Sequence, residues 1–223
     1  MRQHVIITAG GSGTRLQSEL PKQFLLLNKL PMLMHTMKKF SGISGKIIVT
    51  LQENHFETWE KLCSAYQFEI PHEIVSGGES RFHSVKNAME KITDDDSLIA
   101  VHDGVRPAVS EELIQRIFDA AEKNGNAVPF LPLSESIRQV DEKGNAYADR
   151  KNFISIQTPQ CFSIKSLRRA YAQKFIESFT DDAAAVEAAT GEKIFLVEGK
   201  KQNVKITTME DLIFAEQVMS MQQ

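Results

Sequence analysis

Short β-branched runs alternate with segments of helical hydrophobic spacing along much of this chain. Strands are predicted at residues 4–9, 46–51 and 97–102. The intervening segments carry apolar residues three and four positions apart, which predicts helices at 31–40, 56–66, 85–92 and 110–124. Repeated strand–helix units of this length predict an α/β fold, with a mainly parallel sheet flanked by helices on both faces.

The alternation is interrupted between residues 133 and 156. Two strand-like runs there flank the turn sequence DEKGN, which predicts an antiparallel β-hairpin that projects from the sheet. Later segments predict a helix at 164–175, an alanine-rich helix ended by Gly191, strands at 194–199 and 203–207, and a last helix capped by Thr208 and Asp211. No linker-like tract divides the chain, so residues 1–223 are predicted to form a single domain with an arm at 133–156.

Composition excludes several classes of partner. The 223 residues include 26 Lys and Arg against 29 Asp and Glu, a balance that is atypical of proteins that coat nucleic acid or membranes. No apolar run approaches the ~18 residues of a membrane span, and a strand begins almost at Met1, which leaves no room for a signal peptide. Two cysteines, Cys63 and Cys161, fit a reducing cytosol. We therefore expect a cytoplasmic protein with no nucleic acid and no membrane partner.

The first predicted strand ends in a glycine-rich turn, T-A-G-G-S-G-T-R-L at residues 8–16. Glycines let backbone N–H groups approach phosphate oxygens closely. Gly13 is not followed by the lysine of a Walker A loop, and position 16 lacks the third glycine of a dinucleotide fingerprint. What remains is a glycine loop with its own cation, Arg15, and with Lys22 soon after it. This combination suits phosphoryl or nucleotidyl transfer, and the alternative is a structural turn with two solvated cations.

Further segments follow this loop in a recognisable order. After A-G-G-S-G-T-R-L and P-K-Q-F come GGESRFHSV at 77–85, VHDGVRP at 101–107, QTPQ at 157–160, TDDA at 180–183 and NVKIT at 203–207. Together they cover nearly the whole chain and resemble the polyol-phosphate cytidylyltransferases, most closely those acting on 2-C-methyl-D-erythritol 4-phosphate. The resemblance implies a Rossmann-like nucleotidyltransferase fold whose β-hairpin is a dimerisation arm.

The reaction that the resemblance implies transfers CMP from CTP to 2-C-methyl-D-erythritol 4-phosphate, in the non-mevalonate route to isoprenoid precursors. A phosphate monoester is already an anionic nucleophile, so catalysis rests on positioning and charge neutralisation. By resemblance, Arg15 and Lys22 are the catalytic residues that stabilise charge on the α-phosphate, and Mg²⁺ bridges phosphate oxygens. The triphosphate is implied to lie on the loop backbone at Ala9, Gly10, Gly11 and Gly13.

The cytosine and ribose are implied to contact a second polar turn. Its residues at matching positions are Gly78, Glu79 and Ser84. The same turn also has the sequence of a helix start capped by Ser80, and this structural role holds whatever the ligand.

A third segment follows the predicted strand 97–102. Asp103 is implied to hold Mg²⁺ or its waters, and Gly104 and Arg106 are implied to lie near the nucleotide. Gly104 departs from the alanine common in the family. Two alternatives stay open, because Asp103 could cap the loop or pair with Arg106, and Arg106 could serve only to brace this loop.

The polyol phosphate needs cations of its own, and the resemblance assigns Arg150 and Lys205 to it. In the family the arm crosses to a second subunit, so Arg150 would serve the neighbouring active site of a homodimer. The substrate hydroxyls are implied to lie near Ser136, Thr158, Thr180 and Asp181. Ser136 stands where the family has threonine and keeps the hydroxyl group.

Three other functions compete with this one. A ribitol 5-phosphate cytidylyltransferase shares the glycine loop and the later motifs, and a CTP-binding module without turnover would keep the nucleotide site. A metal-dependent glycosyltransferase of related topology is disfavoured because no D-x-D element follows a central strand. The late acidic segment TDDAAAVE favours the methylerythritol phosphate enzymes over the first alternative.

Overall fold

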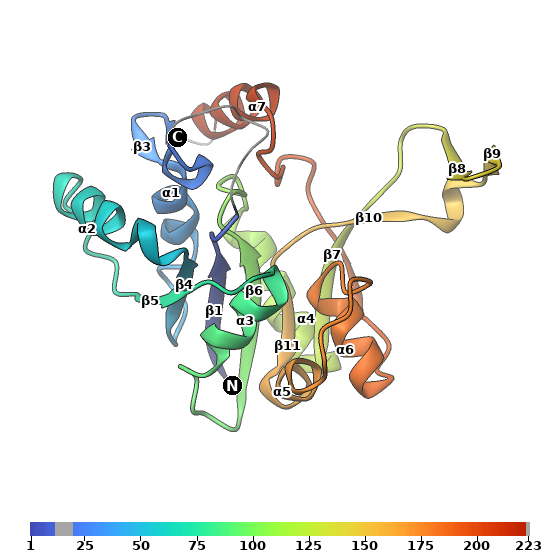
Figure 1. The fold of residues 1–223 in the computed structure, drawn as a ribbon, viewed down its shortest axis with the longest axis horizontal. Coiled ribbons are helices and arrows are strands. Elements are labelled where there is room, and N and C mark those ends of the chain that lie inside the picture. The colour runs from blue at the N-terminus through green and yellow to red at the C-terminus, as the bar shows by residue number, and fades with distance from the viewer. Residues whose placement is uncertain (12–19, 222–223) are drawn as a thin grey trace.

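The computed structural model describes residues 1–11 and 20–221, and within them an eight-stranded sheet forms the centre of the molecule (Figure 1). Its strands are β1 (Arg2–Thr8), β4 (Ile47–Leu51), β5 (Glu73–Ser76), β6 (Ser97–Asp103), β7 (Asn126–Pro132), β10 (Ile154–Ile156), β11 (Gln160–Ser163) and β12 (Leu196–Glu198). They lie in the order β10-β7-β11-β6-β1-β4-β5, and β12 pairs with β7.

Most strands of this sheet run in the same direction. Parallel pairing joins β5, β4, β1 and β6, and β12 is parallel to β7. The exceptions are β11, antiparallel between β6 and β7, and β10, antiparallel to β7. The predicted α/β fold with a mainly parallel sheet is confirmed.

Helices cover both faces of the sheet. They are α1 (Met32–Lys39), α2 (Phe56–Ala65), α3 (Arg81–Met89), α4 (Glu111–Asn124), α5 (Ile164–Ala172), α6 (Asp182–Thr190) and α7 (Met209–Ser220). Side chains alternate between the faces of a strand. Accordingly, Val5 and Ile7 of β1 pack with α1, α2 and α4, whereas Ile6 packs in the cluster that holds α3, α5 and α6. The central residues of a strand buried on both faces are mostly apolar, as Val5, Ile6 and Ile7 of β1 and most residues of β4 are.

Several helix ends follow directly from the sequence. Ser110 accepts a hydrogen bond from the Leu113 N–H at the start of α4, and Gly125 ends that helix with a φ of 86°. At α7, Thr208 and Asp211 form the predicted capping box. No helix in the described residues is long and apolar enough to cross a bilayer.

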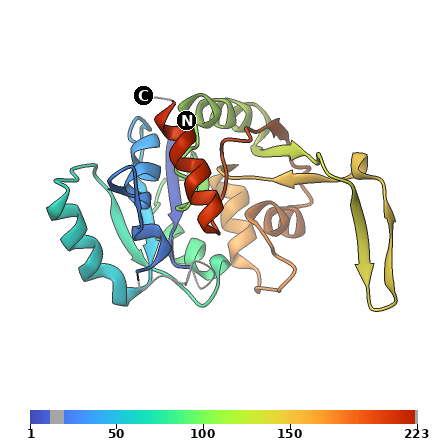
Figure 2. The ribbon, with the colours of Figure 1, turned by 90° about the horizontal axis from the view of Figure 1, so that it is seen from above.

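A β-hairpin projects from the sheet on the side of β7 and β10. It consists of β8 (Ile137–Asp141) and β9 (Gly144–Ala148), which pair antiparallel, and the short turn η4 (Arg150–Asn152) leads back to the sheet. The hairpin extends away from the rest of the chain in both views (Figures 1 and 2). Its side chains are largely exposed, including Val140 at 75% and Tyr147 at 77%.

Some predicted elements differ from the structure. The segment 203–207 is not a strand, because it lies against the loop after β6 through one backbone bond, from the Ile206 N–H to the Val105 carbonyl, instead of joining the sheet. The sequence patterns also missed β5, β7 and β11. These strands are short or carry polar residues such as Asn126 and Gln160, and pairing inside the sheet stabilises them.

The order of the strands determines where a ligand can bind. From β1 the chain moves to β4 and β5 on one side, then returns through α3 to β6 on the other side of β1. The carboxyl ends of β1 and β6 therefore flank a topological switch point, the place where open α/β sheets bind their ligands.

Candidate active site

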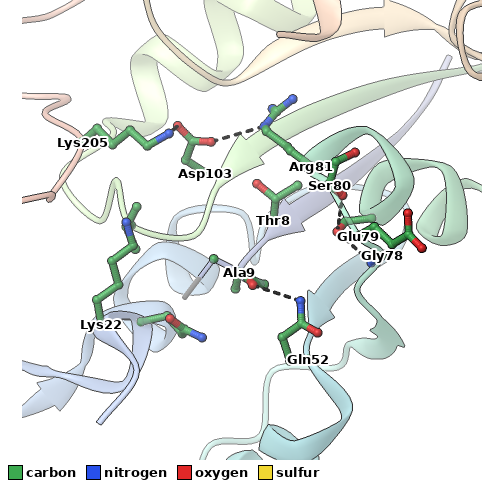
Figure 3. A pocket seen from close by; sticks show the side chains of 15 residues that line it. Thr8, Ala9, Lys22, Gln52, Gly78, Glu79, Ser80, Arg81, Asp103 and Lys205 are labelled. Carbon is green, nitrogen blue, oxygen red and sulfur yellow. Dashed lines mark hydrogen bonds and ion pairs between the residues drawn. The ribbon is translucent and has the colours of Figure 1, made fainter. Parts of the chain in front are cut away.

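A cavity of about 470 Å³ lies at this switch point (Figure 3). Its walls come from the carboxyl ends of β1 and β6, the turn before α3, Gln52 after β4, and Lys205. Two further lining residues, Lys22 and Gln23, belong to the short turn η2 (Lys22–Phe24), which precedes the two-residue strands β2 (Leu26–Leu27) and β3 (Leu30–Pro31). Residues far apart in the sequence thus converge on one site.

The glycine loop begins at this cavity, and its first residues line it. Ala9 directs its backbone N–H at the Thr50 carbonyl, 3.0 Å away, so this N–H serves the sheet and not a phosphate. The Gln52 side-chain amide donates to the Gly10 carbonyl at 3.1 Å and so holds the loop start in place. Gly10 and Gly11 both line the cavity. Gly13 and Arg15 lie outside the described residues.

Lys22 extends its side chain into the cavity with its ammonium end towards the side where Lys205 and Asp103 lie (Figure 3). Its turn is held by Phe24, which is 2% exposed and stacks on Trp59 of α2 with ring centroids 6.0 Å apart. This packing anchors the turn from which Lys22 extends.

The turn before α3 forms the opposite wall of the cavity. The Ser84 hydroxyl accepts from the Gly78 N–H and donates to the Ser80 carbonyl, both at 3.0 Å. Ser80 caps α3, as the sequence indicated. Gly78, Glu79 and Ser84 all line the cavity. The hydrogen bonds of the Ser84 hydroxyl, however, stabilise the turn itself.

Asp103 lies at the carboxyl end of β6 among three cations. One oxygen is 3.1 Å from both Arg106 Nε and Lys205 Nζ, and the other is 3.6 Å from Arg81 Nε. Burial alone would raise the pKa of this carboxyl, but Arg81, Lys205 and Arg106 hold it far below its usual range. Arg81 also pairs with the Asp182 carboxylate, and even so these three cations outnumber the two carboxylates that they contact, which favours phosphate.

Arg81 belongs to the second polar turn of the sequence, but it was not among the predicted site residues. Besides facing Asp103, its guanidinium makes a bidentate pair with Asp182 at 2.9 and 2.7 Å, and the Tyr171 hydroxyl donates to the same carboxylate at 2.5 Å. Asp182 is completely buried. A signal was present, because Arg81 is the first residue of α3, where the helix dipole disfavours a cation unless a carboxylate compensates.

Arg106 braces the loop after β6. It pairs with Asp103 and donates from Nη1 to the Asn203 carbonyl at 2.8 Å. Two of the alternative roles considered for these residues are thus present in the structure. Asp103 pairs with Arg106, and Arg106 braces the loop. Gly104 does not line the cavity; its N–H donates to the Thr8 carbonyl, and a Cβ there would lie 3.1 Å from that of Ala9.

Thr158 and His102 complete this bracing network beneath Asp103. The Thr158 hydroxyl accepts from the Asp103 N–H at 3.1 Å and lies 3.0 Å from His102 Nδ1, while His102 Nε2 is 3.2 Å from the Arg106 carbonyl. These contacts fit a neutral imidazole that donates from Nε2 and accepts at Nδ1. Burial lowers the pKa of His102 to about 4.

We expect this histidine to make the fold sensitive to mild acid. Its pKa in the folded protein is lower than its usual 6.5, so the unfolded chain binds the extra proton and stability falls as pH drops from about 6.5 towards about 4. Between pH 7 and pH 5 the loss is on the order of 2 kcal/mol. Urea unfolding of wild type and His102→Gln at both pH values measures it; an equal loss in both proteins would contradict the assignment.

A second cavity of about 250 Å³ adjoins the first and shares Arg81, Asp103 and Lys205 with it. Thr158, Thr180 and Asp181 line it, as does Arg106, so three of the predicted substrate residues meet here together with Lys205. Asp181 also caps α6 by accepting from the Ala184 N–H and receives a bond from Gln160, each at 2.9 Å.

Two predicted substrate residues do not reach either cavity of their own chain. Ser136 is exposed just before β8. Arg150 is the first residue of η4, where its guanidinium donates to the Ser134 carbonyl. Their place on the projecting hairpin leaves them without a role in the site that this chain forms alone.

The described residues at this site offer few side chains that could bind a metal ion. Across residues 1–11 and 20–221, no three His, Cys, Asp or Glu side chains cluster as a metal cage. Asp103 and Glu79 are the carboxylates that line the larger cavity. Mg²⁺ needs few protein ligands when substrate phosphates and waters supply the rest, so these residues fit a metal that arrives with a nucleotide.

Comparison with known proteins agrees with this geometry. A family model described as 2-C-methyl-D-erythritol 4-phosphate cytidylyltransferase matches residues 3–221. The protein of that name from Porphyromonas gingivalis is 42% identical over 219 residues, which cover 98% of each chain.

Solved structures show the same similarity. The 2-C-methyl-D-erythritol 4-phosphate cytidylyltransferase of Thermus thermophilus matches with a TM-score of 0.78 and 29% identity, over 99% of this chain and 100% of that chain. The 4-diphosphocytidyl-2C-methyl-D-erythritol synthase of Anaerococcus prevotii matches with a TM-score of 0.81 and 28% identity, over 98% and 96%.

The fold and the cationic switch-point site define a nucleotidyltransferase. With the match extending over almost its whole length, the chain belongs to the 2-C-methyl-D-erythritol 4-phosphate cytidylyltransferase family.

Proposed function

We propose that this chain transfers the cytidylyl group of CTP to 2-C-methyl-D-erythritol 4-phosphate and releases pyrophosphate. The observation that carries the proposal is a pair of adjoining cavities that share Arg81, Asp103 and Lys205. The larger cavity, with the glycine loop, suits the nucleotide. The smaller one, with polar groups from the segments at 157–160 and 180–181, suits a hydroxylated acceptor.

The chemistry needs no strong base. An oxygen of the acceptor phosphate attacks the α-phosphorus of CTP and forms a new P–O bond, while the bond from that phosphorus to the β-phosphate oxygen breaks and pyrophosphate leaves with the electron pair. Lys22 is proposed to stabilise the charge on the α-phosphate, together with Arg15 from the loop. Lys205 lies where the cavities meet, with a side chain 44% exposed, so it can neutralise either phosphate.

A divalent cation is part of this proposal. When bound, Mg²⁺ would neutralise triphosphate charge and favour departure of pyrophosphate. Asp103 and Glu79 would hold it or its waters. Asp103 can do so only as its contacts to Lys205 and Arg81 loosen, because both of its oxygens face cations.

We also propose that one domain spans residues 1–223, with 133–156 as a dimerisation arm, in a cytoplasmic homodimer. Two observations support the arm. Exposed apolar side chains, Val140 and Tyr147, lie on the projecting hairpin, and Arg150 at its base does not reach a cavity of its own chain. In a homodimer, Arg150 would bind the acceptor phosphate in the partner's site. The unpaired Cys63 and Cys161 fit a reducing compartment.

The reaction is tested by incubating the protein with CTP, Mg²⁺ and one of two acceptors, 2-C-methyl-D-erythritol 4-phosphate or ribitol 5-phosphate. The release of pyrophosphate is measured in each case. We expect release only with an acceptor, and a higher kcat/KM with the first. Faster turnover of ribitol phosphate would overturn the substrate assignment, and CTP binding without release would indicate a binding module.

The shared site predicts complementation between two impaired variants, assayed at an acceptor concentration below the raised KM. Arg150→Ala is expected to raise the KM for the polyol phosphate with little change for CTP, while Lys22→Ala removes turnover. Hybrid dimers of the two would regain activity, because one of their two sites carries both defects and the other carries neither. Arg138→Ala, on the same hairpin, serves as the control with unchanged kinetics. No recovery on mixing would show that each chain is self-contained.

A further inference from the structure

Gln23 carries a buried amide that the described structure leaves without a hydrogen bond. The residue lies between Lys22 and Phe24 in η2 and is 1% exposed, yet it lines the larger cavity. Its Nε2 has no partner in the described residues. Buried side-chain donors are almost always paired in native proteins, so an unpaired one beside a cavity indicates a missing acceptor.

The other unpaired atoms make this position distinctive. Five buried side-chain atoms in the described residues lack a partner, and the remaining four belong to Thr50, Ser97, Arg116 and Asn203. None of those four residues lines the larger cavity, whereas Gln23 does. Among these five residues, Gln23 is therefore the one at which a ligand in the larger cavity could supply the acceptor.

The backbone that carries this amide is fixed by local hydrogen bonds and by packing. The backbone of η2 is closed by bonds from the Phe24 N–H to the Pro21 carbonyl at 2.9 Å and from the Leu25 N–H to the Lys22 carbonyl at 3.1 Å. Phe24 is held against Trp59, as described above. These contacts hold the backbone of η2, and with it Gln23, in place at the wall of the cavity.

The surroundings indicate which acceptor is missing. Three cations, Lys22, Arg81 and Lys205, line the same cavity against two carboxylates, Glu79 and Asp103. A neutral N–H donor among cations bonds best to an anionic oxygen, because hydrogen bonds to charged groups are stronger than neutral ones. Phosphate oxygens of a nucleotide meet this need.

We propose that Gln23 is a substrate-binding residue whose Nε2 donates to a phosphate oxygen of the CTP triphosphate. This assignment rests on the proposed function of the cavity. Burying an unpaired amide destabilises the free protein, and bound nucleotide removes that penalty. Gln23 thus links the stability of η2, and so the position of Lys22, to nucleotide occupancy.

The experiment compares wild type with Gln23→Met, which keeps the shape of the side chain but removes the amide. Thermal unfolding without ligand is expected to be unchanged or shifted to higher temperature, since no donor is then left unpaired. In the same proteins kcat/KM for CTP is expected to fall about 10- to 100-fold, with the KM for the acceptor unchanged. Gln23→Glu, which sets a carboxylate against phosphate, is expected to lose at least as much.

Ser97→Ala is the matched control, because it removes another unpaired buried atom at the far end of β6. It is expected to unfold like Gln23→Met and to keep wild-type kinetics. A lower unfolding temperature for Gln23→Met with wild-type kcat/KM for CTP would overturn the proposal, as would a loss confined to the acceptor. Should Gln23→Met fail to fold, Gln23→Glu supplies the comparison. Wild-type turnover in the same assay tests the proposed function separately.

Discussion

Lys22→Ala is expected to lower kcat by ~10²-fold or more, with a much smaller change in the KM for CTP. The α-phosphate gains charge as the acceptor oxygen attacks, and a cation inside the cavity stabilises that state more than the bound substrate. Removing the ammonium group therefore removes an interaction made chiefly in the transition state. Steady-state kinetics with CTP and 2-C-methyl-D-erythritol 4-phosphate, measured separately for each substrate, give the two constants.

Two further variants separate the charge from its position. Lys22→Arg keeps the charge but replaces a compact ammonium with a planar guanidinium, so only partial activity is expected. Lys61→Ala removes an exposed lysine of α2 that pairs with Glu57, and should leave kcat unchanged. An unchanged kcat in Lys22→Ala, or a loss seen only in KM, would show that Lys22 binds substrate without assisting the chemical step.

Arg81→Met is expected to destabilise the protein by about 3–5 kcal/mol. Asp182 is fully buried, and Arg81 is the cation that compensates its charge through two hydrogen bonds. Without Arg81 the carboxylate keeps only the Tyr171 hydroxyl as a side-chain donor among its described contacts. Chemical denaturation at neutral pH measures the loss, provided that the variant is folded at zero denaturant.

A second substitution tests the physical reason for that loss. Arg81→Met with Asp182→Asn removes both charges, and Asn can still accept from Tyr171, so the double variant is expected to regain most of the stability. Arg2→Met breaks an exposed pair with Asp94 and should cost less than about 1 kcal/mol. If the double variant were no more stable than Arg81→Met, an uncompensated buried charge would not be the cause.

The strands β1, β4 and β6 of the central sheet were predictable because each of them is encoded locally. The buried centre of β1 and most of β4 are apolar on both faces, and helix α1 between them carries one apolar stripe, so the pattern predicts burial without knowledge of the partner. Helix ends at Ser110, Gly125 and Thr208 were predictable for the same reason, since a cap depends on residues three or four positions away.

Elements that depend on distant partners were not predictable. Gln160 starts β11, yet it is buried because its side chain bonds to Asp181 and to the Ala183 N–H, more than twenty positions away. The segment at 203–207 has strand-like composition, but Asn203 and Ile206 pair with the loop after β6 and hold it outside the sheet. Local propensity yields here to tertiary contacts.

By itself, the sequence determined the kind of chemistry: a glycine loop, Lys22 and the later motifs mark a chain that handles phosphates. Only the tertiary structure decided how the charges are distributed. It surrounds Asp103 with Arg81, Arg106 and Lys205, gives Arg81 a second carboxylate, and leaves the Gln23 amide unpaired. The physical reason is that charge compensation and hydrogen-bond pairing depend on distances of a few ångströms between residues that lie far apart in the sequence, and chain order does not record those distances.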